Sequence, residues 1–360
     1  MNHKKKLLYI MGIDWNWIYQ RPQVLAEKLS RDYDVTVLFP RSILSSVKLA
    51  RPKVPGITFR MLRTLPYQEK NPLIGFCSRC LNAAVLHGIG KYDLIYIGYP
   101  VYARYIPSGY QGKVVYDCMD NHEFLYPDRK RVEKVLRQER RLMQSCSLLL
   151  VSSLWLKQKA DMMAGMEKSL LLRNAPGIEA VYPPEASGKK AVYTLCYIGT
   201  IAEWFDYSLL AYSLECCSNI QYRLIGPRKN KKEIPGIFYS GVLGREYLGT
   251  AAMETDCLIM PFVLNPLVEA VDPVKLYEYI ALGKCIVSVY YPEIERFEDF
   301  VYFYHTKEEY VSLLSELAEQ GFAPKYDRKM QGEFLAENTW EKRYQVLREQ
   351  MDALEEQLES

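Results

Sequence analysis

The chain has 360 residues, about half of them hydrophobic and a quarter charged, with a net charge of +3. This composition is typical of a soluble globular protein, and the length suggests two domains or one large one. No apolar run approaches the ~20 residues that span a membrane, and residues 7–11 are too short a run for a signal peptide, so we expect a cytoplasmic protein.

The nine cysteines predict neither disulfides nor a zinc site. Their number is odd, and several lie in apolar runs, as Cys196, Cys257 and Cys285 do. Cys77-x-x-Cys80 is the only C-x-x-C spacing, and neither a second pair nor a histidine cluster accompanies it, whereas zinc needs about four ligands. We expect the cysteines to be reduced and mostly packed.

The charge is divided unevenly along the chain. Residues 1–187 carry 28 Lys and Arg against 16 Asp and Glu, a net +12, whereas residues 188–360 carry 18 against 27, a net −9. This asymmetry favours two functional halves, of which the basic one could face an anionic membrane or a phosphorylated acceptor. The candidate basic surfaces are Lys4–Lys6 and a predicted helix over 129–141. No nucleic-acid-binding motif is present, so we expect no nucleic-acid partner.

The first half opens as a doubly wound α/β domain. Strand 7–11 ends at Gly12, a helix opened by Arg21-Pro22 follows a loop, and residues 33–39 predict the next strand. Further strands are predicted at 56–62, 92–99, 113–118, 147–153 and 169–173, and helices at 71–90, 129–144 and from 154.

Polar and aromatic residues follow the first predicted strand. Ligands of a doubly wound sheet bind at the carboxyl ends of its strands, which places Asp14, Trp15 and Arg21 at a binding crevice. The structural alternative is that the tryptophans cover the core and that Arg21 pairs with Glu27 or with a helix end.

The polar stretch at 182–190, with two prolines, predicts a linker, after which the α/β alternation restarts. Strands are predicted at 192–198, 220–225, 238–242, 257–262 and 285–289, and helices at 207–216, 307–319 and from 340. We assign an N-terminal domain (1–182), a linker (183–190), a C-terminal domain (191–338), and a last helix (339–360) expected to pack back on the N-terminal domain.

The segment 272–289 predicts a helix followed by a buried strand. Asp272 can cap the helix, and Pro273 fits its first position. Lys275 in the first turn adds an ammonium to the helix dipole and the free N–H groups, which together form an anion site. Glu278 lies three residues on and shares that face, so it can accept hydrogen bonds from a ribose. The alternative is an ordinary surface helix with an i,i+3 ion pair.

The pattern P-x-K-L-x-E-Y-x-A-x-G-K at 273–284 resembles the donor-nucleotide helix of bacterial GT-B glycosyltransferases. The segments W-x-W-x-x-Q-R-P-Q-x-L-A-x-x-L (15–29), Y-I-G-T-I-x-x-W-F-D-Y-x-L-L (197–210) and R-L-I-G-P (223–227) stand in the family's order. The resemblance covers most of the chain and implies an α/β protein of two Rossmann-like domains. It is closest to enzymes that build bacterial capsular, exopolysaccharide or teichuronic acid polymers.

The resemblance also implies a donor site, with the family's lysine on the donor diphosphate and its glutamate on the ribose. The implied donor-binding residues are Gly199, Thr200, Arg228, Pro273, Lys275, Leu276 and Glu278. Many retaining members carry two glutamates separated by seven residues, but the earlier position here is Ala270, with Glu269 one residue before it. The donor-sugar contact and the stereochemical outcome therefore stay open.

Glycosyl transfer must stabilise the departing nucleotide and activate the acceptor hydroxyl. Because no Asp-x-Asp dyad stands in a metal position, we expect basic groups, and neither a metal nor a cofactor, to neutralise the leaving group. The family loop Y-D-x-x-D ends at Asp120, our first candidate for the base in an inverting reaction; His122 is the second. Asp117 is expected to be structural, and a loop Asp or His is more often a cap than a catalyst.

The expected function is transfer of a sugar from a nucleotide-sugar donor, a UDP-sugar, to a saccharide or lipid-linked saccharide acceptor. One alternative is a nucleotide-sugar 2-epimerase on the same fold, which would need no acceptor. Another is a non-catalytic partner subunit that keeps the fold for binding. An NAD-dependent oxidoreductase is disfavoured, because no G-x-G-x-x-G follows a predicted strand.

Overall fold

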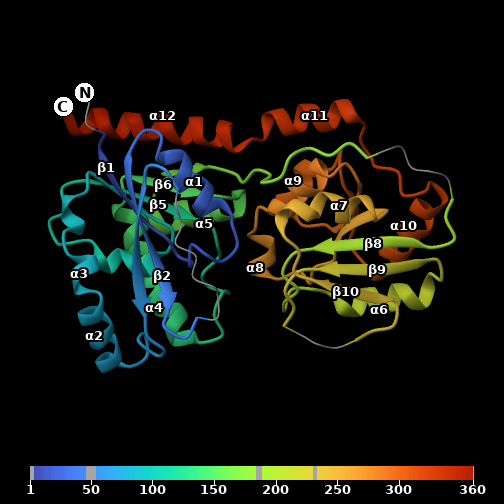
Figure 1. Ribbon diagram of the computed structural model, residues 1–360, viewed down its shortest axis with the longest axis horizontal. Helices are drawn as coiled ribbons and strands as arrows, with labels where there is room; N and C mark the ends of the chain where they lie inside the picture. Colours follow the sequence, from blue (N-terminus) through green and yellow to red (C-terminus); the bar gives the residue numbers. More distant parts are fainter. Residues whose placement is uncertain (1–3, 46–53, 184–188, 230–232, 360) are drawn as a thin grey trace. The chain divides into compact units, whose positions relative to one another are not determined.

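The computed structural model describes residues 4–45, 54–183, 189–229 and 233–359. The chain divides into two compact units, each built on one parallel sheet (Figure 1). The first unit comprises Met1–Arg173 and Glu341–Ser360, and the second comprises Asn174–Trp340. The first unit thus ends nine residues before the predicted end of the N-terminal domain at 182, and most of the predicted linker, residues 184–188, lies outside the described residues.

The sheet of the first unit has the strand order β3-β2-β1-β4-β5-β6-β7, and all its pairings are parallel. Its strands are β1 (Lys6–Ile10), β2 (Asp34–Ser42), β3 (Ile57–Thr64), β4 (Leu94–Ile97), β5 (Lys113–Cys118), β6 (Leu148–Val151) and β7 (Ser169–Leu171). The central strands are continuous apolar runs because helices cover both faces of such a sheet.

Helices follow most of these strands. They are α1 (Arg21–Leu29), α2 (Pro72–Leu81), α3 (Ala83–Leu86), α4 (Arg129–Ser145) and α5 (Leu154–Ala164), with the short 3-10 turns η1 (Ile89–Lys91) and η2 (Pro100–Tyr105). The helix predicted over 71–90 is therefore broken at Asn82, which ends α2, and again at Gly88, whose φ is +79°. Such a positive φ is unstrained only for glycine.

The last helix, α12 (Trp340–Glu359), belongs almost entirely to the first unit. It buries one apolar stripe at helical spacing. That stripe consists of Tyr344, Leu347, Met351 and Leu354. Polar contacts fix its first turn, because the Glu341 carboxylate accepts hydrogen bonds from Lys28 (2.7 Å) and Arg31 (2.9 Å).

The sheet of the second unit repeats the order of the first six strands of the other sheet, with the parallel strand order β10-β9-β8-β11-β12-β13. Its strands are β8 (Tyr193–Ile198), β9 (Ile220–Ile225), β10 (Ile237–Gly241), β11 (Cys257–Met260), β12 (Cys285–Val289) and β13 (Tyr302–Tyr304). Its helices are α6 (Tyr207–Cys216), α7 (Leu248–Met253), α8 (Pro266–Glu269), α9 (Val274–Ala281), α10 (Lys307–Glu319) and α11 (Arg328–Glu337), with the 3-10 turns η3 (Arg245–Tyr247) and η4 (Pro292–Phe297). Helices α7, α8 and α11 were not predicted from the sequence pattern.

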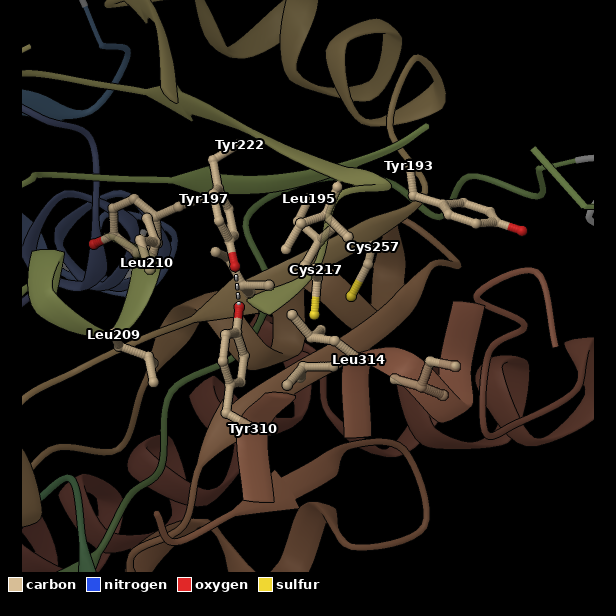
Figure 2. Close-up of a cluster of buried hydrophobic side chains, with 14 of the residues drawn as sticks. Tyr193, Leu195, Tyr197, Leu209, Leu210, Cys217, Tyr222, Cys257, Tyr310 and Leu314 are labelled. Carbon is tan, nitrogen blue, oxygen red and sulfur yellow. Dashed lines mark hydrogen bonds between the residues drawn. The ribbon is translucent and has the colours of Figure 1, made fainter. Parts of the chain in front are cut away.

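Tyrosines are prominent in the core on one face of this second sheet (Figure 2). Tyr222 on β9 and Tyr310 on α10 are fully buried, and their hydroxyls lie 3.1 Å apart. Ser213 also contacts the Tyr222 hydroxyl, at 2.6 Å, so that this buried polar atom is satisfied. Successive residues of β8 alternate between this core and the core on the opposite face, as a strand buried on both sides requires.

Both sheets reverse their direction of growth beside their first strand, between β1 and β4 and between β8 and β11. In open α/β sheets the ligand crevice lies at the carboxyl edge of this switch point. No single helix in the described part of the chain is long and apolar enough to cross a membrane. One helix pair bent by 66°, Pro72–Leu81 with Ala83–Lys91, meets the length and composition criteria together.

Candidate functional site

Glycines form the carboxyl edge of the second sheet at its switch point. Gly199 follows β8, Gly226 follows β9 and Gly241 ends β10. The Gly199 N–H donates to Ile225 O (2.8 Å), and the Gly226 N–H donates to Gly241 O (2.7 Å). A Cβ at Gly226 would lie 2.0 Å from Gly199 O, so only glycine fits there. Bare backbone is therefore exposed to whatever binds at this edge.

The helix α9 is fixed against this edge by hydrogen bonds from its own side chains. The Tyr279 hydroxyl accepts from the Ile198 N–H (3.0 Å) and donates to Ile259 O (3.3 Å), which ties α9 to β8 and β11. At its other end, Gln331 of α11 donates to the carbonyls of Ile280 (2.8 Å) and Ala281 (3.1 Å). The first turn of α9 is thereby held beside the switch point.

Lys275 in that first turn lies directly against Gly199. A Cβ at position 199 would be 2.3 Å from Cε of Lys275 and 3.0 Å from its Nζ. The ammonium faces the rings of Tyr197 and Phe262, with Nζ 5.6 and 5.8 Å from the ring centroids. Among the described residues it makes no hydrogen bond or ion pair. Burial lowers the pKa of Lys275, and the nearby Glu278 charge opposes that shift.

The start of α9 differs from the prediction. Pro273 is the N-cap and Val274 the first helical residue, whereas Asp272 was predicted to cap and Pro273 to begin the helix. The buried Asp272 carboxylate instead accepts hydrogen bonds from the Asn174 N–H (2.6 Å) and the Tyr277 hydroxyl (3.2 Å). It also pairs with Arg296. Asp272 therefore has a structural role: its carboxylate is held by the backbone of Asn174, 98 residues away.

Three further predicted donor residues have different surroundings. Leu276 is fully buried in the core, so its side chain positions the helix and is unavailable to a ligand. Glu278 is half-buried on the same helix face as Lys275. Thr200 accepts a hydrogen bond from the Tyr197 hydroxyl (2.9 Å) at its carbonyl, which orients the ring beneath Lys275.

Arg228 lies in the loop after β9, beside the loop that follows β8. Its guanidinium stacks on the Tyr239 ring, 3.8 Å from the centroid, and Nη2 donates to Glu233 (2.6 Å). The other terminal nitrogen, Nη1, is buried and has no hydrogen-bond partner in the described part of the chain. Arg228 therefore keeps one donor for an anion at this edge.

At the carboxyl edge of the first sheet, the strongest charges are already paired. Nε and Nη2 of Arg21 donate to the two Asp117 oxygens at 2.9 and 2.8 Å, and Nη1 donates to Leu172 O at 2.7 Å. The Tyr96 hydroxyl donates to Asp117 as well (2.8 Å). Arg21 is only 4% exposed and pairs with Asp117 rather than with Glu27, which argues against its predicted acceptor contact. Asp117 is structural, as predicted.

The other predicted acceptor residues lie in the loop after β1. The Asp14 carboxylate pairs with Arg41 (2.7 Å) and accepts from the Asn16 N–H (2.9 Å), which closes a turn. Trp15 packs edge-on against Phe59 of β3, with ring centroids 4.7 Å apart. Both side chains stay partly exposed at the predicted crevice.

The loop after β5 carries the two predicted catalytic residues in contrasting environments. Asp120 is exposed, and its carboxylate makes no hydrogen bond to any described residue. Although the side chain reaches the surface, the protein packed around its carboxylate still desolvates it and raises the pKa of Asp120, and the Asp117 charge adds to that effect. His122 is 4% exposed, and burial lowers its pKa to about 4. These surroundings favour Asp120 over His122 as a group that meets substrate.

Behind this loop lies a buried acidic group that the sequence did not reveal. Glu139 of α4 accepts from the Tyr116 hydroxyl (2.7 Å), and His122 Nε2 lies 3.8 Å from the same oxygen. Burial raises the pKa of Glu139 to about 7. Nδ1 of His122 has no hydrogen-bond partner within the described residues. Glu139 is 23 residues from Tyr116, so spacing alone carried no signal for this cluster.

No group of three or more potential metal ligands occurs among the described residues. The rings of Tyr197 and Phe262, which form two walls around Lys275, were also missed. Their positions could have indicated this role, because each ring lies at the carboxyl end of a strand that flanks the switch point.

No family model matches the chain. A curated relative is TuaH of Bacillus subtilis (strain 168), described as a candidate teichuronic acid biosynthesis glycosyltransferase. It is 24% identical over 218 residues, which cover 53% of this chain and 54% of TuaH. The match thus spans about half the length of that relative.

Solved structures match over nearly the whole chain. Sucrose-phosphate synthase from Thermosynechococcus elongatus has a TM-score of 0.71 at 12% identity, covering 99% of both chains. Anabaena HepE in complex with UDP-glucose has a TM-score of 0.66 at 15% identity, covering 97% of this chain and 99% of HepE. The lipopolysaccharide outer core galactosyltransferase WaaB has a TM-score of 0.67 at 12% identity, covering 97% and 99%. The protein therefore has the fold of GT-B glycosyltransferases, as the sequence predicted.

Proposed function

We propose that this protein is a glycosyltransferase that moves a sugar from a nucleotide-sugar donor to a saccharide or lipid-linked saccharide. The observation that carries the proposal is the ammonium of Lys275, held against Gly199 with no anionic partner at hydrogen-bond distance. A desolvated cation beside a helix N-terminus and bare glycine backbone is a site for a diphosphate. The similarity to HepE, whose structure contains UDP-glucose, supports UDP as the nucleotide.

In this proposal the second unit holds the donor. Lys275, the start of α9 and Nη1 of Arg228 neutralise the diphosphate as negative charge develops on it. Glu278 accepts hydrogen bonds from the ribose hydroxyls. The leaving group is then stabilised by fixed cations and dipoles of this chain.

The first unit supplies the acceptor side. Asp120 removes the proton of the acceptor hydroxyl in an inverting reaction, since its carboxylate is exposed and uncommitted. The name of TuaH supports a bacterial surface polysaccharide as the product class. We also propose that the basic first half, at +12, brings the protein to an anionic membrane that carries a lipid-linked acceptor.

Calorimetry with UDP tests the donor site. Lys275→Ala should weaken UDP binding by about 1–3 kcal/mol, as expected for a charge-assisted contact. Lys329→Ala, at an exposed lysine on α11 of the same unit, is the matched control and should bind UDP like the wild type. Unchanged affinity in Lys275→Ala would remove the central claim.

A panel of nucleotide sugars, assayed for nucleotide release with and without saccharide acceptors, separates the alternatives. Acceptor-dependent release with a glycosylated product is the expected result. Conversion of the donor without an acceptor would identify an epimerase. UDP binding without turnover of any donor would favour a non-catalytic subunit.

A further inference from the structure

The helix α2 is built with its polar side inward. Only Ser78 of α2 is buried, and its hydroxyl donates to Gln68 Oε1 at 2.6 Å. Asn82, at the end of α2, pairs with the backbone of Arg63 on β3 through two hydrogen bonds of 2.8 Å. Asn71 caps the N-terminus by accepting from the Leu73 and Ile74 N–H groups. Hydrogen bonds therefore attach α2 to the first unit.

Apart from the half-buried Ile74, the large apolar side chains of α2 face outward. Leu73 is 76% exposed, Phe76 is 58% exposed, and Tyr67 in the preceding turn is 73% exposed. Leu81 is exposed as well, and the short helix α3 that follows has no buried residue. A surface helix of a globular protein normally buries such a face. An outward apolar face that polar contacts hold in place is typical of a surface that binds something apolar.

A cationic cavity of about 250 Å³ lies beside this face. Its lining includes four cations, Lys70, Arg79, Arg104 and Lys134, and one carboxylate, Glu69. Glu69 pairs with Arg104 (2.8 Å) and Lys134 (3.1 Å). One carboxylate against four cations leaves the cavity positive.

The cations of this cavity differ in whether they have an ion-pair partner. Lys70 pairs with Asp128 at the N-terminus of α4 (3.0 Å). Arg79 has no ion pair with any described residue, and its guanidinium lies 5.9 Å from the Phe76 ring centroid. An uncompensated guanidinium therefore lies directly beside the exposed ring, so the charge and the apolar surface form one continuous face.

We infer that this face, defined by Tyr67, Leu73, Phe76, Leu81 and the cations of the cavity, docks the protein on an anionic phospholipid bilayer. The apolar side chains enter the boundary between headgroups and acyl chains, and the cations bind headgroup phosphates. The apolar face argues for a bilayer rather than a soluble anion, and the positive cavity argues for anionic lipid. The inference rests on the membrane part of the proposed function and gives it a specific surface.

The basic segment Lys4–Lys6 is less suited to this role. Nζ of Lys4 donates to the carbonyls of Ser30 (3.0 Å) and Arg31 (2.6 Å), and Lys5 pairs with Glu355 (2.9 Å). Their charges are already used in packing the N-terminal end of β1. The cavity also follows the carboxyl ends of β3 and β4, the sheet edge on which the Asp120 loop lies. A lipid-linked acceptor would be presented at the edge where its hydroxyl is to be activated.

Co-sedimentation of the full chain with vesicles tests the inference. The wild type should bind phosphatidylglycerol vesicles at low salt and bind phosphatidylcholine vesicles weakly. The double variant Leu73→Ser, Phe76→Ser should lose about tenfold or more in affinity. Arg79→Glu should lose about tenfold at low salt and less at high salt, because the ions screen its charge. Circular dichroism confirms that each variant is folded.

Matched controls lie elsewhere on the same unit. Met162→Ser removes an 80% exposed apolar side chain from α5, and Arg141→Glu reverses an exposed charge on α4, the rival basic surface at 129–141. Both should bind vesicles like the wild type. Equal binding to both lipids at all salt concentrations, or wild-type binding by the double variant, would overturn the inference. So would self-association that the double variant abolishes in a protein that binds no vesicle.

Vesicle binding is measured without donor or acceptor, so it separates this inference from the proposed function. Lys275→Ala should bind vesicles normally. Vesicle binding by a protein that transfers no sugar would leave the docking face standing alone. Sugar transfer to a soluble acceptor without vesicle binding would overturn the docking face and leave the transferase intact.

Discussion

The six strands of the second sheet follow the same order as the first six strands of the first sheet. The carboxyl edges of the two sheets differ in whether their charged side chains are paired. At the first edge the chain satisfies its own charges, since Arg21 pairs with Asp117 and Asp14 pairs with Arg41. At the second edge Lys275 faces glycine backbone and aromatic rings and has no ion-pair partner among the described residues. A charge that the fold leaves unsatisfied is available to a ligand, whereas a paired one maintains the fold. Asp120 is the exception at the first edge.

Replacing Asp120 should have the largest effect on turnover. Asp120→Asn should reduce turnover about 10²–10⁴-fold if the enzyme inverts, because a positioned base contributes that much. UDP affinity should stay nearly unchanged. Steady-state kinetics with calorimetry measures both quantities. Glu123→Gln, at an exposed carboxylate of the same loop, should keep wild-type turnover.

The anomeric configuration of the product completes this test. If configuration is retained, the acceptor proton need not go to this loop, and Asp120→Asn should keep most of its rate. An inverting enzyme with wild-type turnover in Asp120→Asn would refute the assignment. A collapse of turnover in His122→Ala alone would transfer the role to His122.

The paired charges should instead act on stability. Arg21→Met leaves the fully buried Asp117 carboxylate without its partner, and should lower the free energy of unfolding of the first unit by about 3–5 kcal/mol. Chemical denaturation measures this loss, while UDP affinity should be unaffected. Arg348→Met, which removes an exposed pair on α12, should cost less than about 1 kcal/mol. A fully stable Arg21→Met variant that binds UDP poorly would reverse the comparison.

The buried pair behind Asp120 gives the comparison a pH signature. Glu139 has an ordinary pKa of 4.5, raised to about 7 in the fold, so its contribution is full below about 4.5 and is lost as pH rises to about 7. His122 has an ordinary pKa of 6.5, lowered to about 4, so its contribution grows as pH rises from about 4 to 6.5. The two slopes oppose each other, and wild-type stability should change little across this range.

Single variants should expose each slope. In Glu139→Gln the stability should rise by about 3 kcal/mol between pH 4 and 6.5, and in His122→Asn it should fall by a similar amount between pH 4.5 and 7. Denaturation midpoints across pH measure both slopes. Parallel pH profiles in the two variants would contradict the opposite shifts of the Glu139 and His122 pKa values.

The smallest effect tests the glycine contact of Lys275. Gly199→Ala places a Cβ 2.3 Å from Lys275 Cε at a φ of +150°, so the flexible lysine must move away. UDP affinity should fall about tenfold while the fold persists. Gly109→Ala, also at a positive φ but with open space around it, should cost stability without changing UDP affinity. Equal UDP affinity in both variants would show that the position of Lys275 is unimportant.

The sequence predicted the features that depend on near neighbours. Buried parallel strands are continuous apolar runs, so their positions were predictable, and the shared face of Lys275 and Glu278 follows from helical spacing. The pairing of Arg21 with Asp117 was not predicted, because the two residues are 96 positions apart. The prediction that Asp272 caps α9 was wrong, because its carboxylate accepts a hydrogen bond from a backbone N–H 98 residues away. The outward apolar face of α2 was hidden because helical periodicity gives the faces of a helix and leaves their orientation open.

The return of α12 to the first unit has a consequence for biosynthesis. The second unit is one continuous segment, 174–340, whereas the first is complete only when residues 341–359 have been translated. Until then the surface that receives Tyr344, Leu347 and Met351 has nothing to cover it. The unit that emerges first from the ribosome is thus the last to finish folding, and its apolar surface stays uncovered for more than 160 residues of synthesis.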